Sequence, residues 1–364
     1  MGRCHALADS EVLIYGAGIA GMVAACNLAR EGYSVKVLEK EPGFGGSRAI
    51  NPSTHTTPLD LAATSEYIGI DISPAFKPVD SIGFYLHDFR IELPAASSYN
   101  VERSSRPESL DALLYEKCRG LGVAFEFNRP LSREEIPGLP PRTIVACGPD
   151  QEACDYLEIP YDYNYAWMAR GEADRPNDAW IWLDECINEY GYISFCNGIY
   201  FNLLFSSGQE VTEEGLERYR GFMRRTEGME EDDWEYIRGV TPVAIPDNPR
   251  LIRKGLIMAG TISGCIDPFM GFGISGALVS GKVAALAVAD REKAEEEFAR
   301  FTRNFARVFT FKRETWKKIR ERVDLLEEIA RILGPERSVA LILEGVMHFR
   351  KYFAIPGFSL FSCN

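Results

Sequence analysis

A glycine-rich turn near the start of the chain constrains the fold more than any other feature of the sequence. Gly16-Ala-Gly-Ile-Ala-Gly21 lies between a β-rich run at 11–15 and a segment of small and apolar residues at 22–30, and a second β-rich run follows at 34–38. In such a turn the first glycine permits the tight bend, the second lets a pyrophosphate approach the backbone at the helix N-terminus, and the third lets the helix pack on the strand. The arrangement predicts a strand, helix and strand unit that binds a dinucleotide.

An acidic residue completes this motif. Glu39 ends the second β-rich run, where its carboxylate would accept hydrogen bonds from the hydroxyl groups of an adenosine ribose. A carboxylate at this position disfavours a 2′-phosphate, so the expected ligand is FAD or NAD rather than NADP.

The rest of the chain divides into regions of different pattern. A helix is expected after Pro107, with strands at 123–127 and 143–146. Residues 156–205 are aromatic-rich and strand-like, and Asn197-Gly198 within them is typical of a two-residue hairpin turn. A capped helix is expected from Thr212, followed by a solvated acidic loop at 227–235 and a nearly all-helical region after 284.

The longest apolar stretch, residues 255–281, is long enough to span a bilayer. However, it contains seven glycines and the pair Asp267-Pro268, which would break a membrane helix. We therefore expect a buried strand, a turn and a helix that starts near Gly273 and runs on into Arg291.

Composition excludes several classes of protein. The 364 residues are 46% hydrophobic, which predicts about two folded domains rather than a disordered or fibrous chain. The net charge of −13 disfavours nucleic acid as a partner. Nine scattered cysteines form no CxxC pair, so we expect a reducing, cytoplasmic compartment and mostly inert buried thiols. The four histidines lack metal-ligand spacing, and no metal site is predicted.

Two segments resemble known flavoproteins. Lys40 to Arg48, which contains the pair Gly45-Gly46, resembles the loop that follows the acidic residue in flavoproteins of the glutathione-reductase superfamily, where it lies along the FAD. Residues 255–281 resemble the C-terminal FAD segment of the geranylgeranyl reductase and aromatic hydroxylase flavoproteins, with Thr261 in place of that family's aspartate. A threonine hydroxyl can still accept a hydrogen bond, without the charge.

The resemblance implies further cofactor contacts. Arg103, before Leu110-Asp-Ala-Leu-Leu114, matches an arginine that lies near the cofactor in this family, with Arg106 as a rival, and Gly148 follows a strand that approaches the adenosine. Cys265 could also lie near the flavin ring, although a buried inert thiol is the simpler interpretation. The predicted FAD-binding residues are Gly16, Gly18, Ala20, Gly21, Glu39, Lys40, Gly46, Ser47, Arg103, Gly148, Thr261, Asp267, Gly271, Gly273 and Ile274.

The implied fold is α/β, with a discontinuous Rossmann-like FAD-binding domain, an inserted antiparallel β-sheet substrate domain and a helical C-terminal segment. The expected FAD-binding domain comprises 1–50, 98–155 and 245–290, the substrate domain 51–97 and 156–244, and the helical segment 291–364.

The first functional hypothesis, drawn from the resemblance, is an FAD-dependent reductase. It would reduce a C=C bond of an apolar, isoprenoid-like or conjugated substrate, with NAD(P)H or a small electron carrier as reductant. The alternatives are an FAD-dependent aromatic monooxygenase and a protein that keeps this fold to bind a ligand or partner without redox chemistry. No catalytic residue is predicted.

The region 298–322 carries a separate signal. It holds nine basic and two acidic residues, with phenylalanines at 298, 301, 305 and 309 in helical spacing. One interpretation is a helix on an anionic membrane at the inner face, where a lipid-like substrate would be found. The other is an amphipathic helix docked on the FAD domain with its basic face in water.

Overall fold

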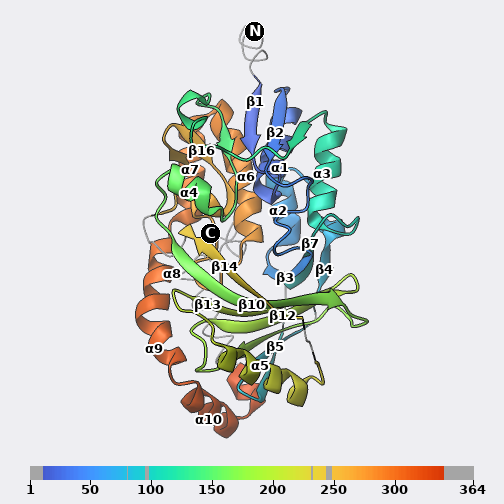
Figure 1. Cartoon of the computed structure of the whole chain (residues 1–364), viewed down its shortest axis with the longest axis vertical. Helices are drawn as coiled ribbons and strands as arrows, with labels where there is room; N and C mark the ends of the chain where they lie inside the picture. Colours follow the sequence, from blue (N-terminus) through green and yellow to red (C-terminus); the bar gives the residue numbers. More distant parts are fainter. Residues whose placement is uncertain (1–10, 80, 95–97, 231–232, 243–247, 340–364) are drawn as a thin grey trace.

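The computed structural model describes residues 11–79, 81–94, 98–230, 233–242 and 248–339. Two sheets organise this part of the chain, one in the upper and one in the lower half of Figure 1. None of the described helices is both long and apolar enough to cross a membrane.

The upper sheet is the predicted nucleotide-binding unit. It has six strands, and neighbouring strands are parallel except at the β15–β16 edge. In spatial order they are β15 (Ile252–Arg253), β16 (Leu256–Met258), β9 (Ile144–Val145), β1 (Val12–Tyr15), β2 (Val35–Glu39) and β8 (Ala124–Phe127). Helices α1 (Ile19–Arg30), α3 (Leu110–Gly120) and α6 (Ile274–Ala289) pack with this sheet in one hydrophobic core, and α4 (Gln151–Tyr156) follows β9. The α/β prediction with a Rossmann-like domain is confirmed.

The lower sheet is the predicted inserted one, and it is mostly antiparallel. Its strands, in spatial order, are β14 (Glu235–Thr241), β10 (Asp162–Glu172), β13 (Ile199–Ser207), β12 (Tyr190–Cys196), β11 (Ala179–Leu183), β5 (Ser81–Leu86) and β6 (Phe89–Pro94). The expected hairpin joins β12 to β13, with positive φ at both Asn197 and Gly198. Helix α5 (Glu213–Thr226) covers this sheet, and Thr212 caps it by accepting a hydrogen bond from the backbone N–H of Gly215.

A third, three-stranded sheet lies between these halves. It consists of β3 (Ser53–Pro58), β7 (Ser98–Arg103) and β4 (Phe76–Pro78), and β3 and β7 also contact the lower sheet. Helix α2 (Leu61–Ile68) and the apolar side chains of Ile70 and Ile72 share the core of the Rossmann-like part. The predicted boundaries placed residues 51–97 in the substrate domain. We propose that residues 59–76 belong with the Rossmann-like part instead.

The C-terminal region differs from its prediction in two places. The helix expected to run from Gly273 into Arg291 ends at Ala289, because the Asp290 backbone is extended and its carboxylate caps a new helix, α7 (Arg291–Thr302). The region 298–322 is also several short helices rather than one. They are the end of α7, α8 (Phe305–Phe311), a π-helical turn at Lys312–Trp316 and α9 (Lys317–Arg320). Helix α10 (Val323–Leu333) follows and reaches the lower sheet (Figure 1).

Three of the four phenylalanines in the predicted pattern point inward, and the fourth, Phe309, is half-buried. Phe298, Phe301 and Phe305 are buried in the core of the Rossmann-like part. Arg303, Arg307 and other basic side chains beside them are exposed. This arrangement is the docked amphipathic segment with its basic face in water.

Candidate functional site

The glycine turn between β1 and α1 has the geometry that the motif predicts. Gly16 has a φ of 107°, and a Cβ there would collide with the Ala146 carbonyl. A Cβ at Gly21 would collide with the carbonyl oxygen of Gly16. Glycine at these two positions is therefore required by the fold itself, through the tight turn and the close packing of helix on strand.

Gly18 is different, because the fold does not explain it. Its φ of −79° and ψ of −178° are extended backbone that any residue adopts, and a Cβ would meet nothing within 4 Å. It is the N-cap of α1, but it has no side chain to satisfy the free N–H groups of the first turn. A glycine here lets a phosphate approach the backbone of the first turn closely.

The N-terminus of α6 repeats this arrangement. Gly273 is its N-cap and provides no side-chain hydrogen bond. A Cβ added at Gly273 would lie 3.9 Å from its nearest neighbour, an atom of the Ile266 side chain. By contrast, α2, α3, α4, α5 and α7 are capped by the side chains of Asp60, Ser109, Asp150, Thr212 and Asp290. Helices α8, α9 and α10 also lack a side-chain cap, but their N-cap residues are not glycines. Two glycine-capped helix starts are thus available to an anionic or electron-rich ligand.

The two glycine-rich segments are in direct contact. A Cβ at Gly260 would lie 3.1 Å from the Cβ of Ala20, and a Cβ at Gly281 would collide with the Ala20 carbonyl oxygen. The Ser280 hydroxyl accepts a hydrogen bond from the backbone N–H of Gly260 at 2.8 Å. Segments about 240 residues apart in the sequence therefore pack as one unit around Ala20, as the flavoprotein resemblance implied.

Glu39 and Lys40 lie at the carboxyl end of β2. The Glu39 carboxylate is buried and accepts hydrogen bonds from the backbone N–H of Ala17 at 2.6 Å and of Glu41 at 2.9 Å. It is thus fixed beside the glycine turn, where the motif requires it. Lys40 instead forms an ion pair with Asp150 at 2.5 Å. Gly148, with a φ of 67° and open space around it, lies in the same short loop as Asp150.

Arg103 lies against the loop that follows β2. It makes a bidentate pair with the buried Asp111, with Nε–Oδ2 at 2.7 Å and Nη2–Oδ1 at 2.9 Å. A Cβ on Gly46 would come within 3.2 Å of its guanidinium, and the exposed Ser47 is the next residue. Arg106 points elsewhere, because it donates to the Asn197 carbonyl of the β12–β13 hairpin. The geometry therefore favours Arg103 over its rival as a residue near the predicted cofactor.

The turn before α6 contains a buried carboxylate that is only half satisfied. Asp267 Oδ2 accepts a hydrogen bond from the backbone N–H of Met270 at 2.6 Å, whereas Oδ1 has no hydrogen-bond partner. Burial raises the pKa of Asp267. An unpartnered buried oxygen is costly unless a ligand supplies a donor. Gly271, Gly273 and Ile274 lie in or just after the same turn, and Thr261 lies in the 3₁₀ turn Gly260–Ser263 that contacts α6.

An apolar cluster on the lower sheet faces these segments. Met168, Tyr192 and Phe201 form its buried part, and Ile50 of the loop after β2 packs against it. Tyr190 donates a hydrogen bond to the Met270 carbonyl at 2.5 Å, which ties this sheet to the turn before α6. Arg170 donates to the carbonyls of Ala49 and Asn51 at 3.3 and 3.2 Å, which ties the sheet to the loop.

His55 lies at the edge of this cluster. Its ring contacts Phe201 and its Nε2 lies 2.8 Å from the Ser53 hydroxyl. Burial, and then the positive charge of Arg103, lower the pKa of His55 to about 3. The imidazole is therefore neutral at physiological pH, and the apolar cluster adjoins a polar but uncharged side chain.

Cys265 is fully buried, and burial raises its pKa to about 12, which fits an unreactive thiol.

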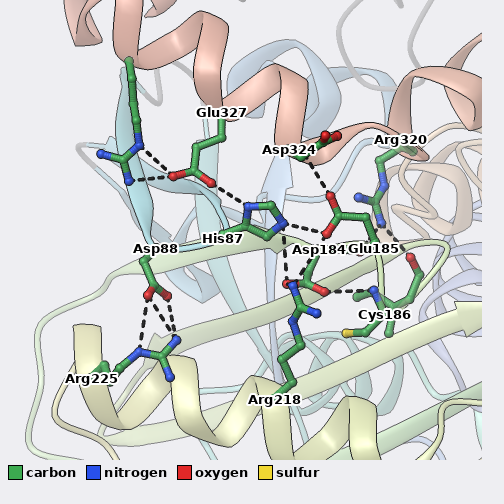
Figure 2. Close-up of polar contacts among 12 residues, drawn as sticks. His87, Asp88, Asp184, Glu185, Cys186, Arg218, Arg225, Arg320, Asp324 and Glu327 are labelled. Atoms are coloured by element: carbon green, nitrogen blue, oxygen red, sulfur yellow. Dashed lines mark hydrogen bonds and ion pairs between the residues drawn. The ribbon is translucent and has the colours of Figure 1, made fainter.

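A second polar cluster joins α10 to the lower sheet (Figure 2). His87 Nδ1 lies 2.6 Å from Glu327 of α10, and Nε2 lies 2.6 Å from Glu185 in the loop after β11. Asp184, beside Glu185, pairs with Arg218 of α5 at 2.7 Å. Burial opposes protonation of His87, but the hydrogen bonds to Glu185 and Glu327 outweigh it and raise its pKa.

Sequence reasoning missed this cluster, since its members come from segments far apart in the chain. Ligand atoms of His87, Asp184 and Glu185 lie within 4.8 Å of one another, so the group has the residue types and spacing of a cation site. The side chains nevertheless pair with one another and with Arg218. We assign the cluster as an ionic link between α10 and the lower sheet.

Sequence comparison with known proteins supports the Rossmann-like unit. Residues 14–67 match the family model described as an NAD(P)-binding Rossmann-like domain. The chain is 31% identical over 115 residues to the flavin-containing monooxygenase FMO GS-OX2 of Arabidopsis thaliana, which is 30% of this chain and 24% of that protein. It is also 47% identical over 127 residues to an iron-sulfur component of the CoB–CoM heterodisulfide reductase of Methanopyrus kandleri, which is 32% of this chain and 17% of that protein. These matches cover no more than about a quarter of the length of either relative.

Solved structures extend the similarity over almost the whole chain. A geranylgeranyl bacteriochlorophyll reductase-like protein from Thermoplasma acidophilum aligns with a TM-score of 0.64 at 17% identity, covering 94% of this chain and 96% of that one. The p-nitrophenol 4-monooxygenase of Pseudomonas putida aligns with a TM-score of 0.60 at 14% identity, covering 94% and 98%. The chain therefore has the fold of flavoprotein reductases and monooxygenases, and the predicted geranylgeranyl reductase-like fold is confirmed.

Proposed function

We propose that this protein is an FAD-dependent oxidoreductase that reduces a C=C bond in an apolar substrate. One observation carries the flavin part of the proposal. α1 and α6 both begin at glycines that the fold does not require, and neither glycine gives the first turn a side-chain hydrogen bond. A bound dinucleotide would explain these glycines, because it must approach the backbone closely at the N-termini of both helices.

The residues present fit the predicted cofactor. The N-terminus of α1 would bind the pyrophosphate and Glu39 the adenosine ribose. The N-terminus of α6, with its positive dipole end, suits a ring carbonyl or the negative charge of a reduced flavin. The unpartnered Oδ1 of Asp267 could accept a hydrogen bond there. Arg103, held by Asp111, would place a fixed positive charge beside the loop after β2.

The bound flavin would supply hydride transfer, and the chain would supply binding, orientation and exclusion of water. Met168, Tyr192 and Phe201 are buried in this structure, and together with Ile50 they would form the apolar wall of the substrate site. Arg170 and Tyr190 hold the two cofactor-binding loops against that surface. The imidazole of His55 is neutral and therefore adds no charge at this edge of the apolar cluster.

An anaerobic experiment tests the reaction. The protein is loaded with FAD, reduced, and mixed with prenylated lipids or quinones. The expected result is reoxidation of the flavin together with saturation of a C=C bond in a prenylated acceptor. No turnover with any of them would contradict the reductase proposal.

An aromatic monooxygenase is the second candidate, and the similarity of fold to a p-nitrophenol 4-monooxygenase favours it. That enzyme class consumes dioxygen together with its substrate. Oxygen uptake that depends on both NAD(P)H and an aromatic substrate would select this function over the reductase.

A binding protein without redox chemistry is the third candidate. It is motivated by Thr261, which removes a charge from the position where the resembled family has an aspartate. Failure of the folded protein to take up added FAD would favour this candidate over both enzymes.

The cellular setting is also a proposal. The seven cysteines among the described residues are free thiols, which supports a reducing, cytoplasmic compartment. NAD(P)H or a small electron carrier would reduce the flavin. The exposed basic side chains of 298–322 would give electrostatic contact with an anionic membrane, and salt-sensitive flotation with anionic liposomes tests that contact.

A further inference from the structure

Two cysteines from different helices lie side by side in the core of the Rossmann-like part. Cys26 of α1 and Cys118 of α3 place their sulfur atoms 3.0 Å apart, and neither side chain is exposed to solvent. A disulfide bond is about 2 Å long, so the sulfur atoms need to approach by about 1 Å to form one. Helices α1 and α3 already pack against each other, which keeps this movement small.

The surroundings of the two thiols shift their pKa values in opposite directions. The hydrogen bond from Cys118 lowers the pKa of Cys26, although burial opposes it, and the positive charges of Arg30 and Lys117 act in the same direction as the hydrogen bond. The same contact raises the pKa of Cys118, whose sulfur lies 3.2 Å from the Met22 carbonyl oxygen. In the reaction proposed below, Cys26 is therefore the attacking sulfur and Cys118 the resolving one.

The two cysteines lie on helices that each begin at the candidate cofactor site. α1 begins at the glycine turn, and α3 begins with the carboxylate of Asp111 that holds Arg103. A covalent bond between the two helices would fasten together two elements that each carry part of the candidate cofactor site.

We propose that Cys26 and Cys118 are a redox pair that a hydroperoxide converts into a reversible disulfide. The Cys26 thiolate attacks the peroxide oxygen, so that an S–O bond forms, the O–O bond breaks and hydroxide leaves. The Cys118 sulfur then attacks the Cys26 sulfur, so that the S–S bond forms and the S–O bond breaks. The hydroxyl group leaves as water with the proton of Cys118. With hydrogen peroxide, two thiols are oxidised and one peroxide is reduced to two waters. A peroxide is suited to this site because only a small oxidant can reach two buried sulfur atoms.

Peptide mapping of the wild-type protein tests the proposal without any variant. The folded protein is treated with hydrogen peroxide, denatured, alkylated and digested. The expected product is a peptide pair linked through Cys26 and Cys118, with an intact mass lower by about 2 Da. Dithiothreitol should restore both thiols. Because the bond closes a loop of more than 90 residues, the oxidised protein should also unfold at a temperature higher by roughly 5 °C.

Variants identify the residues. Cys26→Ser and Cys118→Ser should each abolish both the linked peptide and the rise in unfolding temperature. Cys196→Ser removes another buried cysteine, in the lower sheet, and should behave like wild type. The proposal is overturned if Cys26 and Cys118 stay fully alkylatable after peroxide treatment, if they oxidise to sulfinic acids without a cross-link, or if the cross-link joins other cysteines.

Discussion

Replacing Gly18 by valine separates what the fold requires from what the ligand requires. The backbone at this position is extended, a conformation that β-branched residues adopt readily. An added Cβ would meet nothing within 4 Å. The free energy of unfolding of the ligand-free protein should therefore fall by no more than about 1 kcal/mol, the cost of placing valine at an N-cap.

The same substitution should strongly weaken FAD binding. The valine side chain would fill the space that the N–H groups of the first turn of α1 face, and so keep a pyrophosphate from reaching them. Each hydrogen bond to a charged group contributes about 1.5–3 kcal/mol, so loss of two costs about 3–6 kcal/mol. FAD affinity should therefore fall at least about 100-fold.

The assay measures the two properties separately. FAD titration of the ligand-free protein, followed by flavin fluorescence, gives the affinity, and thermal unfolding gives the stability. Gly21→Val is the matched control, because its Cβ would collide with the Gly16 carbonyl oxygen and should disrupt the fold. The reasoning is refuted if Gly18→Val binds FAD as tightly as wild type, or if it is destabilised as much as Gly21→Val.

Two further predictions concern ionic contacts. Asp111→Ala leaves the Arg103 guanidinium without its buried partner and should lower the free energy of unfolding by about 3–5 kcal/mol, measured by urea denaturation. Asp88→Ala is the control, because it breaks an exposed pair with Arg225 and should cost no more than about 1 kcal/mol. Equal losses in the two variants would contradict the buried pair. The raised pKa of His87 means that its link to Glu185 and Glu327 is fully present below the unfolded value of 6.5 and is lost as the pH rises through the folded value. The stability difference between wild type and His87→Gln should be largest below pH 6.5 and should shrink as the pH rises above it, and a difference that stays constant would count against the link.

The local features of this fold could be predicted from the sequence because each depends on a few consecutive residues. The turn at 16–21, the cap at Thr212 and the hairpin at Asn197-Gly198 all rest on backbone conformations that a short motif specifies. The break between α6 and α7 was missed, because Asp290 in a charged segment looks the same whether it continues a helix or caps a new one.

Contacts between distant segments could not be predicted in this way. The cluster around His87 needs α10 to return to the lower sheet, and the Cys26–Cys118 pair needs the crossing of α1 and α3. Motif spacing does not encode such distances when no family pattern covers them. The pairing of 16–21 with 260–281 was foreseen only through the flavoprotein resemblance, and the structure supplies its physical basis in the packing of Ala20 against Gly260 and Gly281.

The flavin content of the folded protein tests the central claim most directly. The absorbance spectrum of the purified protein, together with FAD titration of any ligand-free fraction, measures it. We predict a flavin band at about 450 nm and a saturable stoichiometry of one FAD per chain. A protein that unfolds cooperatively, yet shows no such band and takes up no added FAD, would contradict the account.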